Sequence, residues 1–195
     1  SNGGSSIMAT LNATNLKHAS SGSNNIVLAA DGSTTISNLS NAGKILQVVQ
    51  TFKTDSASQS GNSSTVFYDI AGMSASITPS SSSNKILVMY TAQVASSGAT
   101  GRANIIRLLR GSTPIGSSTA GSTTNGQIFH RTVQYNPETK NMMYLDSPNT
   151  TSATTYKLQW SVEGSGGSST TYYINDTSGG SHGMTSHITL MEVAV

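Results

Sequence analysis

Apolar residues recur at every second position in several short runs of this chain. The clearest run places Tyr156, Leu158, Trp160 and Val162 on one face of an extended segment, with polar residues between them. A period of two is that of a half-buried β-strand, and no segment of helical length shows a convincing 3.6-residue period. This pattern predicts an all-β fold.

Clusters of Gly, Ser, Asn and Asp separate the alternating runs, and these residue types favour turns. Asn125-Gly126, for example, is a strong turn dipeptide. Many short strands with frequent turns predict an antiparallel β-sandwich, jelly-roll-like in arrangement. The ten expected strands cover residues 44–54, 64–70, 73–78, 84–94, 102–116 with a bend near Gly111, 127–135, 140–146, 154–163, 169–175 and 185–195.

Residues 1–43 differ from the rest of the chain. Short apolar stretches alternate there with Asn, Ser and Asp-Gly turns, so one copy could bury little apolar surface. Three copies wound together could each supply one face. We therefore expect a β-rich neck, or the end of a trimeric fibre shaft, over 1–43 and a β-sandwich head over 44–195. Residues 1–7, "SNGGSSI", have the composition of an expression-tag remnant or of a truncation point in a longer chain.

The strand expected at 84–94 is apolar on both faces and follows a polar "PSSSS" turn. Ile86, Val88 and Tyr90 lie on one face, and Leu87 and Met89 lie on the other. A strand that is apolar on both sides is covered on both sides. The sandwich core can cover one side, and contact with another subunit is the simplest cover for the other.

Charged residues make up only 9% of the chain, against about 25% in an average soluble domain. Counting along the sequence gives 35 Ser and 25 Thr, so hydroxyl groups replace charges. This composition is common in extracellular and viral fibrous proteins, whose chains associate closely. A net charge of +2 with scattered Lys and Arg argues against nucleic-acid binding.

Two further absences narrow the classes of protein. The chain has no cysteine, which excludes disulfides and thiolate metal sites and suits folding in a reducing cytoplasm. No apolar run approaches the ~20 residues that span a bilayer, so we expect no membrane insertion.

Four phrases occur in order across residues 77–195: "ITPSSSSNKILVMY", "IIRLLRGSTPIG", "TTYKLQWSV" and "ITLMEVAV". This part of the chain resembles the C-terminal head domain of tail-fibre and related virion proteins of tailed bacteriophages, especially marine ones. The segment "LKHASSGSNNIVLAADGS" resembles the repeat units that precede such domains. The resemblance implies a homotrimeric head on the virion, assembled in the host cytoplasm. It also implies partners, namely other virion proteins at the N-terminal end and a host-surface glycan or outer-membrane protein.

Catalytic and metal-binding patterns are weak. His18, His130, His182 and His187 form neither His-x-His nor HExxH, although one histidine per chain on a trimer axis could make a three-nitrogen metal site. The eight carboxylates are isolated in sequence, whereas a glycosidase needs two facing each other across a cleft. We expect no catalysis and no cofactor.

Aromatic residues offer a second possible site. Trp160 lies on the apolar face of its strand, which predicts a core or interface position, with a sugar-stacking platform as the alternative. Tyr172 and Tyr173 are adjacent, so they point to opposite faces of a strand. One should be buried and the other exposed.

Three functions are compatible with these features. The leading one is a fibre head that attaches the virion to its host. The second is a capsid decoration or head-fibre protein, and the third is a polysaccharide depolymerase.

Strict alternation of ten strands from Gly43 predicts which loops lie at the tip. Loops 55–63, 79–83, 117–126, 147–153 and 176–184 fall at the distal tip, and loops 71–72, 95–101, 136–139 and 164–168 fall at the neck end. Loops on a rigid scaffold usually carry binding residues. The candidate receptor contacts are therefore Asp55, Gln59, Asn62, Asn125, Asn149, Asp176 and His182.

Overall fold

The structure is a computed structural model that describes residues 14–20, 22–23, 26–36, 43–97, 102–117, 126–132, 135–162, 170–177 and 183–195. The chain divides into two compact units, Ser1–Asn41 and Ala42–Val195, with the boundary two residues before the expected one. The elements of the described residues are all β-strands. None of the described residues belongs to a helix long and apolar enough to cross a membrane.

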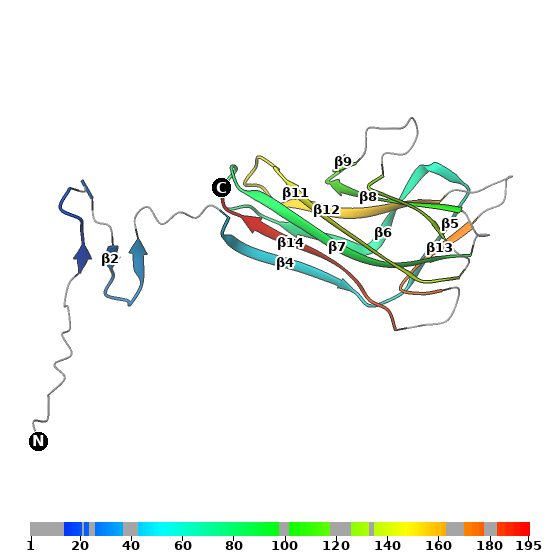
Figure 1. Cartoon of the computed structure of the whole chain (residues 1–195), viewed down its shortest axis with the longest axis horizontal. Coiled ribbons are helices and arrows are strands. Elements are labelled where there is room, and N and C mark those ends of the chain that lie inside the picture. Colours follow the sequence, from blue (N-terminus) through cyan, green and yellow to red (C-terminus); the bar gives the residue numbers. More distant parts are fainter. Residues whose placement is uncertain are drawn as a thin grey trace, which may run out of the picture. The chain divides into compact units, whose positions relative to one another are not determined.

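The N-terminal unit contains a small antiparallel sheet of β1 (Asn15–Leu16), β2 (Ile26–Leu28) and β3 (Thr34–Ile36), drawn in blue in Figure 1. The β2–β3 turn uses Gly32 at a positive φ, and the Asp31 carboxylate accepts a hydrogen bond from the Ser33 amide. Leu28 and Ile36 are exposed, so this sheet buries little apolar surface by itself.

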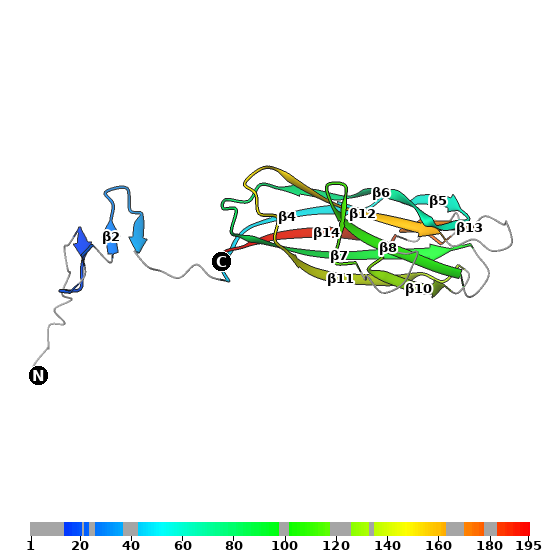
Figure 2. The same ribbon diagram turned by 90° about the horizontal axis from the view of Figure 1, so that it is seen from above.

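The C-terminal unit is an antiparallel β-sandwich of two sheets (Figures 1 and 2). Sheet I has the order β4 (Ile45–Lys53), β14 (Ser186–Val193), β7 (Lys85–Ser96), β11 (Glu138–Asp146). Two short strands, β5 (Ala57–Gly61) and β13 (Thr170–Ile174), pair with each other, and β13 pairs with the last residues of β7. Sheet II has the order β10 (Ile128–Thr132), β8 (Arg102–Arg110), β12 (Thr154–Val162), β6 (Ser63–Ile77), with β9 (Thr113–Ile115) beside β8.

The strand order is that of a jelly roll. In chain order the principal strands are β4, β6, β7, β8, β10, β11, β12 and β14. Consecutive strands lie in different sheets, except β8 and β10, which pair in sheet II, and this is the pattern of two Greek keys. The predicted all-β antiparallel sandwich with a jelly-roll-like arrangement is therefore confirmed.

The core lies between the inward faces of the two sheets. Leu158 and Trp160 of sheet II pack in one cluster with Val88 and Tyr90 of sheet I. Trp160 is only 3% exposed, and its ring centroid lies 6.4 Å from that of Tyr172. Trp160 is thus a core residue, as predicted, and the sugar-platform alternative is wrong.

The adjacent tyrosines also differ as expected, because they lie on opposite faces of β13. Tyr172 is fully buried, and Tyr173 is partly exposed.

One expected loop does not exist. Residues 63–77 form the single long strand β6, whereas two strands with a turn at 71–72 were predicted. Gly72 adopts φ +79°, and the pairing of β6 with β12 changes register beside it, so the chain bulges without turning back. The predicted count therefore had one turn too many, and the directions that it gave to the strands after β6 were opposite to the observed ones.

The last strand nevertheless returns to the end where the chain enters the sandwich. β13 and β14 both run antiparallel to β7, so two successive strands run in the same direction. This second departure from alternation cancels the first, and β14 runs in the predicted direction. The Gly43 amide donates to the Ala194 carbonyl (2.7 Å), and the Ala194 amide donates to the Lys44 carbonyl (2.9 Å). We call this the entry end and the opposite one the far end.

Several loop positions must be corrected for the same reason. Segments 79–83 and 147–153 lie at the entry end and not at the tip, because β6 and β11 run toward it. Segments 95–97 and 135–139 lie at the far end and not at the neck end. Loops 118–125 and 163–169 lie outside the described residues.

Candidate functional site

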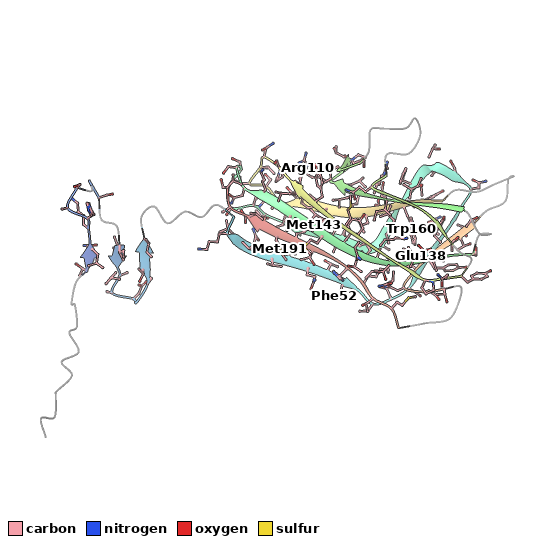
Figure 3. The ribbon with its side chains drawn as sticks, in the orientation of Figure 1. Phe52, Arg110, Glu138, Met143, Trp160 and Met191 are labelled. Carbon is pink, nitrogen blue, oxygen red and sulfur yellow. The ribbon has the colours of Figure 1, made fainter. Side chains whose placement is uncertain are left out.

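An apolar surface covers the outward side of sheet I. Alternation places Met143 and Leu145 of β11, Leu87 and Met89 of β7, Met191 of β14, and Val48 and Phe52 of β4 on this side. We call these seven residues the apolar face. Met143 is 63% exposed, Phe52 59% and Val48 56%. Met143, Met191 and Phe52 mark three of the strands in Figure 3.

The register aligns these side chains in rows across the sheet. Leu145 lies opposite Leu87, Leu87 opposite Met191, and Met191 opposite Val48. Directly opposed side chains in a sheet are close enough to pack together. The face is therefore continuous across four strands.

The polar side chains among these rows bond to one another. Thr91 donates to the Asn141 side-chain oxygen at 2.8 Å, and the Gln50 amide donates to the Thr189 hydroxyl at 2.7 Å. Phe52 packs beside His187 with ring centroids 5.3 Å apart. The two hydrogen bonds satisfy part of the hydrogen-bonding capacity of these polar side chains within the sheet.

A hollow of about 390 Å³ interrupts this surface. Met89, Met143, Thr91, Asn141 and His187 contribute to its lining, together with Tyr90 and Met142. The lining residues are mainly apolar, and their polar groups are the amide of Asn141, the hydroxyls of Thr91 and Tyr90 and the imidazole of His187. Such a lining suits an inserted side chain better than a charged ligand.

The outward side of sheet II has a different character. The Asp69 carboxylate accepts from the Lys157 ammonium at 2.8 Å and from the Gln159 amide at 2.6 Å. The Arg107 guanidinium donates to the Gln159 side-chain oxygen at 2.6 Å and lies 3.7 Å from the centre of the Phe67 ring. The hydrogen bond from Lys157 holds the pKa of Asp69 below its usual value. This charged network is typical of a solvated surface.

At the entry end, Glu192 is a buried carboxylate held by neutral donors. Asn84 donates at 2.6 Å, Gln47 at 2.6 Å, and both the amide and the hydroxyl of Ser80 at 2.7 Å. Burial by itself would raise the pKa of Glu192, but these hydrogen bonds outweigh it and lower the pKa to about 2. The "PSSSSN" segment is thus an anchor for β14 at the entry end.

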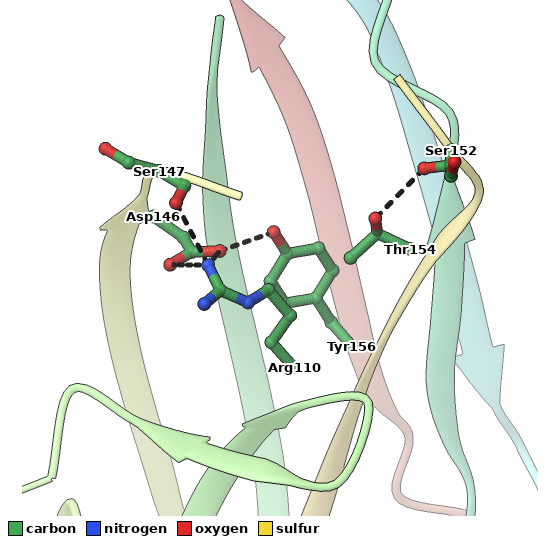
Figure 4. Close-up of polar contacts among 6 residues, drawn as sticks. All are labelled: Arg110, Asp146, Ser147, Ser152, Thr154 and Tyr156. Atoms are coloured by element: carbon green, nitrogen blue, oxygen red, sulfur yellow. Dashed lines mark hydrogen bonds and ion pairs between the residues drawn. The ribbon is translucent and has the colours of Figure 1, made fainter. Parts of the chain in front are cut away.

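A second entry-end cluster links the two sheets (Figure 4). Arg110 of β8 donates to both carboxylate oxygens of Asp146 of β11, at 2.9 and 3.0 Å, and to the Ser147 carbonyl. Tyr156 of β12 donates to Asp146 at 2.7 Å, and burial raises the pKa of this tyrosine. Asp146 has only 6% of its side chain exposed, so the cluster is a structural clamp.

The structure places three of the seven candidate contacts in the connection between β4 and β6. Asp55 follows β4, Gln59 lies in β5, and Asn62 is exposed between β5 and β6. Asp55 also forms an ion pair at 3.0 Å with Lys53, whose side chain is almost fully buried. Asp55 therefore has a structural role in the sandwich.

Asp176 lies in the connection that precedes β14. Its neighbour Asn175 donates to the carbonyls of Lys53 and Asp55, at 2.8 and 3.0 Å, and accepts from the Ser186 hydroxyl at 2.7 Å. This bonding joins the segments that carry Asp55 and Asp176. Loops 55–63 and 176–184, which contain these two residues, were both predicted to lie at the distal tip.

Asn149 does not join them. Asn149 lies at the entry end between β11 and β12, so its assignment to the tip is wrong for the reason given for loop 147–153. Asn125 and His182 lie outside the described residues.

Sequence reasoning missed one exposed aromatic residue at the far end. Tyr135 is 45% exposed, has φ 57°, and donates its amide to the Ser96 carbonyl at 2.8 Å. A bulky residue with positive φ is uncommon, and such strain often marks a functional segment. Tyr135 was predicted to end the strand 127–135, and a strand residue has negative φ, so its left-handed conformation was not foreseen.

The described residues hold no group of three or more His, Asp or Glu side chains that could bind a metal ion. Among the histidines, His18 is exposed in the N-terminal unit and His187 lies on sheet I beside Phe52. The side chains of His130 and His182 lie outside the described set.

No protein-family model matches this chain, and no curated protein matches it. Solved structures of infectious bursal disease virus are similar to it. A Gt-strain structure is 15% identical over 84% of this chain and 40% of that chain, with a TM-score of 0.42. A Gx-strain structure is 13% identical over 79% and 38%, with a TM-score of 0.41. A VP2 subviral particle is 17% identical over 79% and 38%, with a TM-score of 0.35.

This chain spans about two fifths of the length of those proteins. The jelly-roll assignment rests on the strand pairing described above.

Proposed function

We propose that this chain is the head of a virion fibre that attaches to a host surface without catalysing a reaction. The observation that carries the proposal is that the start of β4, the first strand of the sandwich, lies beside the end of β14, the last one. Entry at Gly43 and the C-terminal strand both occupy one end, held by the Gly43–Ala194 and Ala194–Lys44 hydrogen bonds. We infer that the opposite end is the one that faces the host.

Two features of the far end support this role. β5 and β13 extend sheet I beyond β4 and β14 and give the connections there a paired strand framework. Asn62 is exposed beside β5, and the exposed aromatic Tyr135 lies before β11 with its amide bonded to Ser96 of β7. Binding residues are often held on loops by a rigid scaffold in this way.

The resemblance to bacteriophage fibre heads favours attachment over the alternatives, and it also suggests a homotrimer that joins other virion proteins through residues 1–43. Capsid decoration is the second candidate, because jelly rolls occur both in capsid proteins and in lectins. Antibodies against the purified chain, viewed on virions by electron microscopy, distinguish the two. Labelled fibre tips support attachment, and an evenly labelled capsid surface supports decoration.

The attachment surface can be tested with Tyr135→Asn. Asparagine tolerates the positive φ and removes the exposed ring, so the fold should be kept. If the far end binds the host, the purified variant should compete with virions for host cells several-fold less well, because aromatic residues often dominate contacts. Thr151→Ala, an exposed entry-end position, is the matched control.

Competition should be measured beside a thermal melt. A variant that melts like the native chain and competes equally well would contradict attachment through this loop. Loss of competition by Thr151→Ala as well would place the contact elsewhere.

A further inference from the structure

We infer that the apolar face is the contact surface between copies of this chain. It consists of Val48, Phe52, Leu87, Met89, Met143, Leu145 and Met191. Leaving this many large apolar side chains in water is unfavourable, and contiguous patches of this kind usually mark interaction sites. This inference is independent of the proposed attachment through the far end.

The size of the face agrees with a subunit contact. Four strands at the usual spacing, over about eight residues of β4, cover roughly 19 by 26 Å, or roughly 500 Å². Exposed Ile45 and Leu46 extend it at the entry end of β4. With these and a polar rim, it approaches the ~800 Å² that each partner contributes to a standard interface.

The absence of charge identifies the partner as a second copy. All outward-facing residues of β4, β14, β7 and β11 are described, and Lys85 at one corner is the only Lys, Arg, Asp or Glu among them. A different protein would usually be selected by complementary charges, which this face does not offer. The faces of neighbouring copies can pack together here without like-charge repulsion.

The polar groups of the face also suit a dry contact. Thr91–Asn141 and Gln50–Thr189 are bonded within the sheet, so covering them leaves few unsatisfied groups. The hollow between Met89, Met143 and His187 gives the face one concave point that a side chain of the facing copy can fill. Sheet II has charged Asp69, Lys157 and Arg107 at its outward side and is expected to stay solvated.

Val48→Asp in the full chain tests this contact. Val48 is more than half exposed, so the single copy should tolerate the change, whereas in the contact the new carboxylate is buried. The dissociation constant should rise by at least about a hundredfold. Val66→Asp is the matched control, because Val66 is also an exposed strand valine but lies on β6 of sheet II, away from the apolar face.

Two measurements accompany the variants. Light scattering gives the mass, and peroxide oxidation followed by peptide mass spectrometry gives the reactivity of Met143. Met143 should react slowly in the native chain and rapidly in Val48→Asp, since oxidation follows exposure. Fully buried Met73 is the internal reference for an intact fold.

The outcomes separate clearly. Faster oxidation of Met143 in Val48→Asp, with or without a fall in mass, supports the contact, because the N-terminal unit could still hold copies together. Native-chain Met143 that reacts as fast as in Val48→Asp overturns it, as does an effect of Val66→Asp equal to that of Val48→Asp. Attachment to host cells by a chain with a free apolar face would leave the proposed function standing and overturn only this contact.

Discussion

At the scale of single residues, burial distinguishes structural groups from candidate contacts. Trp160 could be assigned to the core from its alternating strand alone, because the pattern of apolar neighbours reports the face. The role of Glu192 could not be predicted, because its hydrogen-bond partners lie more than 100 residues away in sequence. The role of Asp55 could not be predicted, because it depends on the burial of Lys53, which only the fold determines. Lys53, for example, is buried beside Asp55 although lysine is rarely buried.

Glu192 should make the sandwich sensitive to acid. Its pKa is about 2 in the folded chain and 4.5 for the free side chain, so the unfolded chain binds the proton more tightly. The stabilisation is therefore fully present above about pH 5 and is lost as the pH falls from 4.5 toward 2. Urea unfolding at several pH values measures this loss.

Glu192→Gln provides the comparison for that series. It removes the charge, places an amide group among the donors of Asn84, Gln47 and Ser80, and should cost about 1–3 kcal/mol at neutral pH. The acid-dependent loss should be smaller in the variant. An identical pH profile in both chains would show that other carboxylates are responsible.

At the scale of elements, strand positions were predictable and strand directions were not. Periodicity finds a strand from its own residues, so six of the eight jelly-roll strands were placed within three residues of their observed bounds. The exceptions are β6, which was predicted as two strands, and β8, which was predicted to continue to residue 116. Direction depends on whether a glycine turns the chain or bulges it. Gly72 bulges β6, and this difference moved Asn149 from the predicted tip to the entry end.

Polar composition hid other elements. β5 has the sequence "ASQSG", with no apolar alternation, and it forms because β13 offers an edge to pair with. The apolar face was partly foreseen from Leu87 and Met89 on the second side of β7. Its extension over β11, β14 and β4 required the register, which the sequence does not contain.

Gly72→Ala should destabilise the head by about 1–2 kcal/mol, the usual cost of a positive φ for a residue with a Cβ. The space itself is sufficient, because the nearest atoms, in Lys53, would lie 3.5 Å from the new Cβ. Gly72→Asn should cost less, since asparagine tolerates this conformation. Equal melting temperatures for all three chains would contradict the bulge assignment.

At the scale of the whole molecule, the distribution of polarity is unequal. Sheet II presents a charged network, sheet I presents the apolar face, and the N-terminal unit leaves Leu28 and Ile36 exposed. Only 18 of the 195 residues are Lys, Arg, Asp or Glu. We expect a chain built in this way to cover its exposed apolar surfaces by assembling into several copies.

The mass of the purified full chain in solution tests this central claim most directly. Sedimentation equilibrium at micromolar concentration should give a multiple of the 20.1 kDa chain mass, and three copies are expected for a fibre head. Association should persist on dilution, because it rests on apolar burial, and it should vary little with salt. A monomer of 20.1 kDa at this concentration would contradict the claim.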